Sequence, residues 1–487
     1  MLLYVHCTSP TYKKQCENAH IIYFPGHPAY NEAEHSARGR EILRNGGTAM
    51  KMNAYRNAMV EAVSRLVAIP SVFEPDDRTP FGPQVDHCLD EALALMKELG
   101  LRTYKAPDGM YGYAETGEGE LFGVLCHLDV VQARQEDGWE HDPFVPMVQG
   151  DALCGRGTQD DKGPTVAAAY ALKSLMDEGV PLRKRVRFIF GIDEETLWHS
   201  IRAYSQHEEA PASGFVPDSA FPLTYAEKGL LQVHVRTAQP FPLPCQGGDS
   251  LNAVSAHACC PEDDAVRGAL EELGLPWHRQ AGQLCVEGLT AHAKNPWKGK
   301  SANLYLLRAL RKAGYEHPAV AFACDALDEK FRFEGFTDAD LSDFSGPVTV
   351  NLGTMTLGEE GCELGVDLRL PVGCPKETVL ALLREKAAAY GLEVEEYDWL
   401  RPLHVPLDSP LVQNLLAAYR KVTGDETTEP YISAGATFAR AFDNCVAFGA
   451  NLPGSPTSEH QPNERVSIEK LVLAAEVYRE ALTACVT

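Results

Sequence analysis

Apolar residues recur every three or four positions along much of the chain, which is the spacing of one buried face of an α-helix. Met59, Val63 and Leu66 form the first such stripe, and Leu89 and Leu93 belong to the second. The same spacing predicts helices from Gly163 to about Glu178, over about 301–313 and 375–390, from Pro410 to Gly424, and after Ser467.

Short, continuous apolar runs lie between several of these helices and predict buried strands. They cover residues 121–126, 185–192, 230–235, 348–352 and 362–368. Because strands alternate with helices, the pattern predicts an α/β fold with a mainly parallel sheet flanked by helices.

The pattern of predicted strands and helices changes near residue 228 and again near residue 403, after which helices return. We therefore predict a first domain in two parts, 50–227 and 404–487, and an inserted second domain over 228–403. A chain of 487 residues is long enough for two to four domains.

The first 49 residues have a different character, with no clear helical or strand period and no signal-peptide core. Gly46 and Gly47 stand just upstream of Met50, where their codons can spell a ribosome-binding site. Our hypothesis is that synthesis begins at Met50 or Met52 and that residues 1–49 are a leader. A disordered tail is the alternative.

Charge and cysteine usage narrow the class of protein. The chain has 44 basic and 68 acidic residues, a net charge of −24, which repels nucleic acid and anionic membrane surfaces. No apolar run reaches the ~20 residues that a membrane-spanning helix needs. The 14 cysteines are scattered without a CxxC pair, so we expect reduced, mostly buried thiols in a cytoplasmic protein.

A candidate metal ligand ends the first predicted strand, where His127 is followed two positions later by Asp129. Such positions point to one face of a strand, and at its carboxyl end that face opens on the crevice where α/β proteins bind ligands. A metal-binding histidine needs an acceptor that fixes its tautomer, and Asp129 is near enough to serve. A satisfied polar pair is the alternative.

Other acidic or imidazole groups follow predicted strands or lie in polar loops. They are Asp160 with Asp161, Asp193 with Glu194 and Glu195, Asp218, and His460. Each alone has an ordinary explanation as a turn, a helix start or a solvated loop. Together they supply the nitrogen and oxygen ligands of hydrolytic zinc sites, in greater number than one zinc ion needs. The set predicts two zinc ions that share a carboxylate, with a water between them as nucleophile.

Several stretches of the chain resemble the zinc aminoacylase/carboxypeptidase superfamily, in particular its dipeptidase, peptidase V-like branch. They are CHLDVV, DGWEHDPF, CGRGTQDDKGP, RVRFIFGIDEE, GFVPDSAFP, GVDLRLPV, SAGATFARAF and PTSEHQPNE. They occur in the family's order and cover nearly everything after Met50. The resemblance implies a zinc-peptidase catalytic domain whose inserted domain, over 228–403, is an α+β lid.

The resemblance also implies how the metal ligands divide. Asp160 would bridge the two metal ions. His127 and Asp218 would complete the ligands of one ion, and Glu195 and His460 those of the other.

Two further roles in the catalytic domain follow from the same resemblance. Glu194 would be the general base, and Asp129 would orient the neighbouring metal-ligating histidine. The peptide bond between Asp160 and Asp161 would be cis.

The resemblance adds four residues that would contact substrate. His292 of the lid would stabilise the oxyanion, and Arg369 would hold the substrate carboxylate with its guanidinium group. Asn252 would assist Arg369, and the turn at Gly435 would approach the same carboxylate with its backbone. Apart from the resemblance, each is explained as an ordinary loop, turn or ion-pair residue. Lys294 departs from the family pattern, which bears on substrate preference.

These expectations combine into a metal-dependent dipeptidase that acts on short peptides with free amino and carboxyl ends. Its cofactors would be two zinc ions, although manganese or cobalt also suits such ligands. An N-acyl amino acid deacylase or a carboxypeptidase would keep the same site, and a non-catalytic peptide-binding protein is an alternative of another class. We expect a monomer, because dimerising relatives have a shorter lid.

Overall fold

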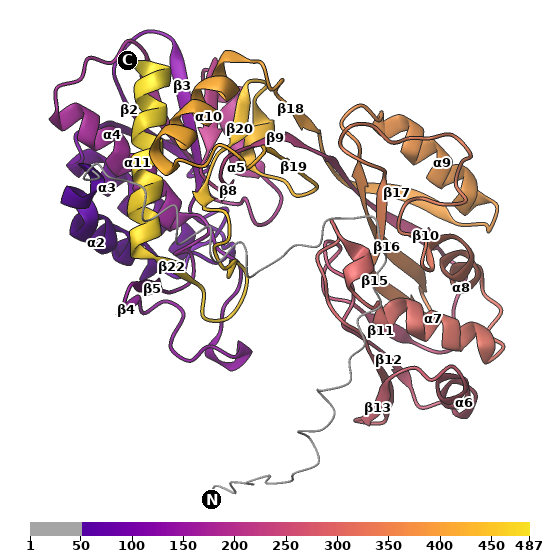
Figure 1. Cartoon of the computed structure of the whole chain (residues 1–487). Helices are drawn as coiled ribbons and strands as arrows, with labels where there is room; N and C mark the ends of the chain where they lie inside the picture. The colour runs from indigo at the N-terminus through magenta and orange to yellow at the C-terminus, as the bar shows by residue number, and fades with distance from the viewer. Residues whose placement is uncertain (1–50) are drawn as a thin grey trace, which may run out of the picture.

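The computed structural model describes residues 51–487, so the predictions for residues 1–49 lie outside the described part. Two lobes, each with its own sheet and its own hydrophobic core, make up this part (Figure 1). The two ends of the described chain form the first lobe together, and the middle of the chain forms the second.

The sheet of the first lobe has nine strands in the order β1-β2-β6-β3-β7-β20-β9-β18, with β19 beside β9. The strands are β1 (Arg102–Lys105), β2 (Gly112–Thr116), β3 (Leu121–His127), β6 (Arg185–Gly191), β7 (Ser213–Val216), β9 (Thr224–Glu227), β18 (Leu403–His404), β19 (Tyr431–Ser433) and β20 (Cys445–Ala447). Neighbouring strands are parallel at the centre, from β6 through β3 and β7 to β20. They are antiparallel towards both edges, except that β19 is parallel to β9. The predicted α/β fold is confirmed, with parallel pairing concentrated at the centre of the sheet.

Helices pack around this sheet. They are α2 (Arg56–Val67), α3 (Pro83–Glu98), α4 (Lys162–Asp177), α5 (His199–His207), α10 (Pro410–Thr423) and α11 (Ile468–Val486), with short helices η2 (Lys51–Tyr55), η3 (Gln135–Asp137) and η6 (Phe438–Ala441). Five of them, α2, α3, α4, α10 and α11, lie where the apolar stripes predict helices. The last helix, α11, lies between α4 and α10 (Figure 1). Within residues 51–487, no helix is long and apolar enough to cross a membrane.

Two small sheets complete the first lobe. One contains β4 (Met147–Gln149), β5 (Ala152–Cys154) and β22 (Arg465–Ser467), and the other contains β8 (Ser219–Ala220) and β21 (Ala450–Asn451). Each joins a segment from the first part of the chain to a segment near its end. These pairings bring distant loops to one side of the main sheet.

The second lobe is an antiparallel sheet with helices packed on it. Its strand order is β13-β14-β12-β11-β15-β16-β10-β17. The elements are β10 (Gly229–Thr237), β11 (Cys245–Gly247), β12 (His257–Pro261), α6 (Asp264–Glu272), β13 (Trp277–Gln280), β14 (Gln283–Glu287), η4 (Pro296–Lys298), α7 (Ala302–Lys312), α8 (Pro318–Phe322), η5 (Ala323–Leu327), β15 (Thr349–Gly358), β16 (Gly361–Leu370), α9 (Lys376–Ala388) and β17 (Glu393–Leu400). This is an α+β arrangement, because consecutive antiparallel strands and helices occupy separate layers.

The chain crosses between the lobes twice. The first crossing is at Lys228, between β9 and β10, and the second lies between β17 and β18. Because β18 begins at Leu403 and pairs with β9 of the first sheet, the second lobe ends before the predicted limit of 403. Buried Arg440 ties both crossings together, donating to Glu227 at 3.0 Å and to the carbonyl oxygen of Arg401 at 3.0 Å.

The prediction that the cysteines are reduced is wrong for one pair, because Cys259 and Cys285 form a disulfide. The two residues are directly opposed on the neighbouring antiparallel strands β12 and β14. Cross-strand partners lie close enough for a disulfide to join them. The two cysteines are 26 positions apart in the sequence, and no motif in the sequence predicts that they pair. The other ten cysteines of residues 51–487 are free thiols, mostly buried.

Candidate metal centre

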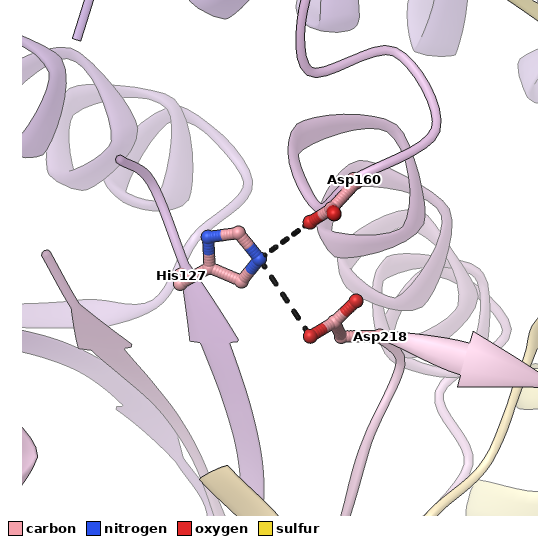
Figure 2. A group of neighbouring side chains, drawn as sticks. All are labelled: His127, Asp160 and Asp218. Atoms are coloured by element: carbon pink, nitrogen blue, oxygen red, sulfur yellow. Dashed lines mark hydrogen bonds and ion pairs between the residues drawn. The ribbon is translucent and has the colours of Figure 1, made fainter. Parts of the chain in front are cut away.

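The site is built around His127, at the carboxyl end of the buried strand β3. Its side chain is only 1% exposed. Nδ1 lies 3.0 Å from the backbone oxygen of Asp129 and donates to it, which leaves Nε2 as the nitrogen that could bind a metal ion. Nε2 faces the carboxylates of Asp160, at 2.7 Å, and Asp218, at 3.7 Å (Figure 2).

Asp160 also belongs to a second group of potential ligands. Its Oδ1 faces His127, whereas its Oδ2 lies 3.1 Å from Nε2 of His460. The same histidine nitrogen lies 2.9 Å from Oε1 of Glu195. Asp160 therefore offers one carboxylate oxygen to each of two histidines.

The residues form two overlapping groups with the chemistry of metal sites. One contains His127, Asp160 and Asp218, and the other contains Asp160, Glu195 and His460. In each group the potential ligand atoms lie within 4.8 Å of one another. Imidazole nitrogen and carboxylate oxygen suit zinc, manganese and cobalt. The structure thus brings together all five residues that the sequence analysis proposed as metal ligands.

Asp129 holds the neighbouring loop as well as the histidine. Its carboxylate accepts the backbone N–H groups of Glu194, at 3.1 Å, and Glu195, at 3.0 Å. The closer contact to His127 is made by the carbonyl group of Asp129, since its carboxylate lies 3.6 Å from Nδ1. The expected orienting role thus falls chiefly to the backbone, while the side chain positions the loop after β6.

Glu464 holds the loop that carries Asp160, a role that was not predicted from the sequence. Its buried carboxylate accepts backbone N–H groups of Gly157 at 3.1 Å and Gln159 at 2.8 Å, and it pairs with Arg156 at 2.6 Å. The loop ends at the cis peptide bond between Asp160 and Asp161 that the resemblance implied. No local pattern marks Glu464, because its partners lie about 300 positions earlier in the chain.

Replacing Glu464 by Gln should loosen this loop and weaken metal binding by about 10- to 100-fold, the usual cost of losing a group that orients a ligand. Calorimetric titration of the metal-free protein with Zn²⁺ would measure the change. Glu469→Gln, on the exposed side of α11, is the matched control. Unchanged affinity in Glu464→Gln would show that the loop holds its shape without this carboxylate.

The electrostatics of the site favour a bound cation. Burial and the neighbouring carboxylate of Asp160 raise the pKa of Asp218 and of Glu195 above their usual values. Burial opposes protonation of His460, but its contacts with Asp160 and Glu195 raise its pKa to about 11. Crowded carboxylates of this kind are ionised together only when positive charge lies among them.

Removing the metal should therefore make stability depend on pH. Burial raises the pKa of Asp161 to about 7, and its acidic contacts raise that of His460 to about 11. A group with a raised native pKa binds more protons in the folded state, so the free energy of unfolding falls as pH rises. The contacts of Asp160 with His127 and His460 lower its pKa despite burial, so its contribution changes only in the acid range and does not alter this trend at higher pH.

The expected result is a melting temperature of chelator-treated protein that falls as pH rises from about 6.5, the usual pKa of histidine, towards about 11, the raised pKa of His460, because the contribution of this histidine is lost over that range. The metal-loaded protein should change less, because bound cations keep the carboxylates ionised. Differential scanning calorimetry of both forms would measure this. A melting temperature of the metal-free form that rises over this range would contradict the assignment.

The second lobe carries His292, which lies near enough to the metal ligand His460 to feel its charge. Nδ1 of His292 accepts the backbone N–H of Lys294 at 3.1 Å, so the ring proton of the neutral form is on Nε2. Desolvation and the positive charges of Arg369, Lys294 and His460 lower the pKa of His292 to about 3. The imidazole is therefore neutral at pH 7 and can donate a hydrogen bond from Nε2.

Arg369, on β16, joins the two lobes. Its Nε and Nη2 donate to the carboxylate of Asp367, at 2.7 and 2.9 Å, and Nη1 donates to the carbonyl oxygen of Ala434 at 3.0 Å. Three of the five N–H donors of a guanidinium group are thereby used, which leaves one on each Nη. These donors are suited to a substrate carboxylate.

The other two predicted substrate residues lie beside these groups. The carbonyl oxygen of Asn252, whose side chain is exposed, accepts the N–H of Ala293, next to His292. Gly435 follows Ala434, but its N–H donates to Oγ of Ser433 at 2.9 Å. In this structure the Gly435 N–H that was expected to approach substrate is occupied within its own turn.

Comparison with known proteins tests the resemblance. Residues 123–484 match Peptidase family M20/M25/M40. A protein of Staphylococcus saprophyticus named "Putative dipeptidase" is 34% identical over 464 residues, covering 89% of this chain and 98% of that protein. One of the same name from Staphylococcus haemolyticus is 35% identical with the same coverage.

The chain belongs to this peptidase family. It is a hydrolase of peptide bonds, as predicted, and its two groups of metal-ligating side chains fit a metallopeptidase. Solved structures share the fold. Human carnosine dipeptidase 1 has a TM-score of 0.58 at 16% identity, covering 91% of this chain and 98% of that chain. The dipeptidase Dug1p of Saccharomyces cerevisiae has a TM-score of 0.58 at 13% identity, covering 92% and 98%.

Proposed function

We propose that this M20-family peptidase is a dipeptidase, which cleaves the peptide bond of short substrates with free amino and carboxyl ends and uses two zinc ions. The observation that carries the proposal is Asp160, which offers one oxygen to each of two ligand groups. The names of the Staphylococcus relatives support the substrate class.

The five metal-ligating residues would hold the two ions. When bound, such ions polarise the carbonyl of the scissile bond and lower the pKa of a water molecule. The remaining steps belong to the protein's own side chains.

Glu194 would move the protons. Burial, together with the carboxylates of Asp218, Glu195 and Asp160, raises its pKa well above the usual value, although the charge of His127 opposes the shift. A carboxylate with a raised pKa accepts a proton from water and returns it near neutral pH. Glu194 would take the proton of the attacking water and deliver it to the nitrogen of the leaving amine.

The lid would contribute the remaining contacts. The Nε2–H of neutral His292 would donate to the oxygen that becomes negative when water attacks the carbonyl. The unused donors of Arg369 would bind the terminal carboxylate of the substrate. Because these two residues lie on the second lobe and the metal ligands on the first, a short substrate would bridge the lobes.

The test uses metal-stripped protein reloaded with zinc, the dipeptide Ala-Ala, its N-acetylated form and the tripeptide Ala-Ala-Ala. Amine release would be measured for each. We expect rapid cleavage of the free dipeptide, with little or no cleavage of the acetylated compound.

Other outcomes would overturn the proposal in different ways. Cleavage of the acetylated compound alone would make the protein a deacylase. Equal cleavage of acetylated and longer peptides would make it a carboxypeptidase. Stoichiometric peptide binding without turnover, in protein that holds its full complement of metal, would make it a binding protein.

A further inference from the structure

A cavity of about 530 Å³ lies between the two lobes beside the metal ligands. From the first lobe it is lined by Ser219 and Ala220, which directly follow Asp218, and by residues 431–434. From the second lobe it is lined by Lys294, Arg332 and residues 345–347, among others. Residues of both lobes therefore form its walls.

The cavity is positively charged in a chain whose net charge is −24. Lys228, Lys294 and Arg332 line it, and none of its lining residues is acidic. Within residues 51–487, none of these three side chains forms an ion pair with a carboxylate. The charge of Asp343 acts on Lys228, and that of Glu459 acts on Lys294, without a direct ion pair to either lysine.

Lys228 is a buried cation, and burial of its positive charge without an anion beside it is unfavourable for the folded protein. Its side chain is nearly buried and has a single polar contact, to the carbonyl oxygen of Pro347. Desolvation, with the charge of Arg332 adding to it and that of Asp343 opposing it, lowers the pKa of Lys228 to about 8. A desolvated cation is stabilised most by an anion placed beside it.

The position of the cavity shows which part of a substrate would reach it. Ala434 lines the cavity and its carbonyl oxygen accepts a hydrogen bond from Arg369, the residue proposed to hold the substrate's terminal carboxylate. Lys294 lies two residues after His292. The cavity thus adjoins the part of the site that would bind the carboxyl-terminal residue.

We propose that this cavity binds the side chain of the carboxyl-terminal residue of the substrate and selects an acidic side chain, as in Xaa-Glu and Xaa-Asp. The inference rests on the proposed dipeptidase function and names its preferred substrate class. Hydrogen bonds to charged groups carry more free energy than neutral ones, so we expect about 10- to 100-fold selectivity over the neutral isostere.

The experiment compares kcat/KM of the zinc-loaded full-length protein for Ala-Glu, Ala-Gln, Glu-Ala and Gln-Ala. Ala-Gln matches Ala-Glu in shape but lacks the charge. Arg332→Gln and Lys294→Gln, both at exposed side chains, remove one cation each. Arg279→Gln, an exposed arginine of the same lobe that does not line the cavity, is the control.

We expect Ala-Glu to exceed Ala-Gln by about 10- to 100-fold in kcat/KM, and this ratio to shrink in both cavity variants but not in Arg279→Gln. Equal rates for Ala-Glu and Ala-Gln in the wild-type protein would overturn the inference and leave the dipeptidase proposal standing. A preference for Glu-Ala over Gln-Ala, without one for Ala-Glu, would overturn the placement of the cavity. Failure to cleave any of the four dipeptides would instead refute the proposed function.

Discussion

Replacing Glu194 by Gln should lower kcat by about 10³-fold, within the range that a general base contributes, while both metal ions remain bound. Glutamine keeps the size of the side chain but cannot accept the proton of water. The backbone contacts of residue 194 persist, because its N–H donates to Asp129 and its carbonyl oxygen accepts the indole N–H of Trp198. The expected defect is therefore chemical, with little change in folding.

Steady-state kinetics with a free dipeptide would measure the loss, and metal analysis of the same samples would show that the ions are retained. Glu120→Gln changes an exposed glutamate just before β3 and serves as the control. If Glu194→Gln kept its metal and about a tenth of the wild-type kcat, another group would have to take the proton of the attacking water.

The parts of the site that local sequence predicts are those fixed by single strands. The apolar run of β3 is buried along its whole length and ends at His127, so the position of this histidine follows from the run. Likewise β6 ends at Gly191, which places Glu194 and Glu195 in the loop after it. In an α/β sheet, residues after neighbouring parallel strands meet at one edge, and β3 and β6 are such neighbours.

The parts that local sequence does not predict depend on contacts between distant segments. Glu464 and Arg440 each hold loops together from the far end of the chain, and each looks like an ordinary polar residue in its own segment. The cross-strand disulfide of Cys259 with Cys285 depends on strand register. Register comes from the packing of a whole sheet, which no short window of sequence contains.

The division of the ligands between two metal ions belongs to this second class. Sequence spacing places Asp160 before α4 and His460 near the end of the chain, without showing that they meet. The resemblance supplied that pairing, and the structure gives it a physical basis in the two oxygens of one carboxylate. The strongest test of this arrangement is a change at Asp160 itself.

Asp160→Asn should lose both metal ions, whereas changes at ligands that belong to one group should lose one. Asparagine keeps the shape of aspartate but has one oxygen and no charge, so it cannot offer an oxygen to each group. Loss of a group that only orients a ligand costs about 10- to 100-fold in metal affinity, and loss of the shared ligand should cost more than that at both sites. Hydrolysis should fall below detection.

The neighbouring residue provides a matched control for this change. The carboxylate of Asp161 accepts the hydroxyl of Thr165 at 3.1 Å and belongs to neither group of potential ligands. Asp161→Asn should therefore keep two ions per chain at saturating metal, with His460→Gln keeping one and Asp160→Asn keeping neither. Metal content after gel filtration would be measured for all three variants. Two ions retained by Asp160→Asn would refute the shared carboxylate, while loss of both ions by His460→Gln would mean that the two sites fill only together.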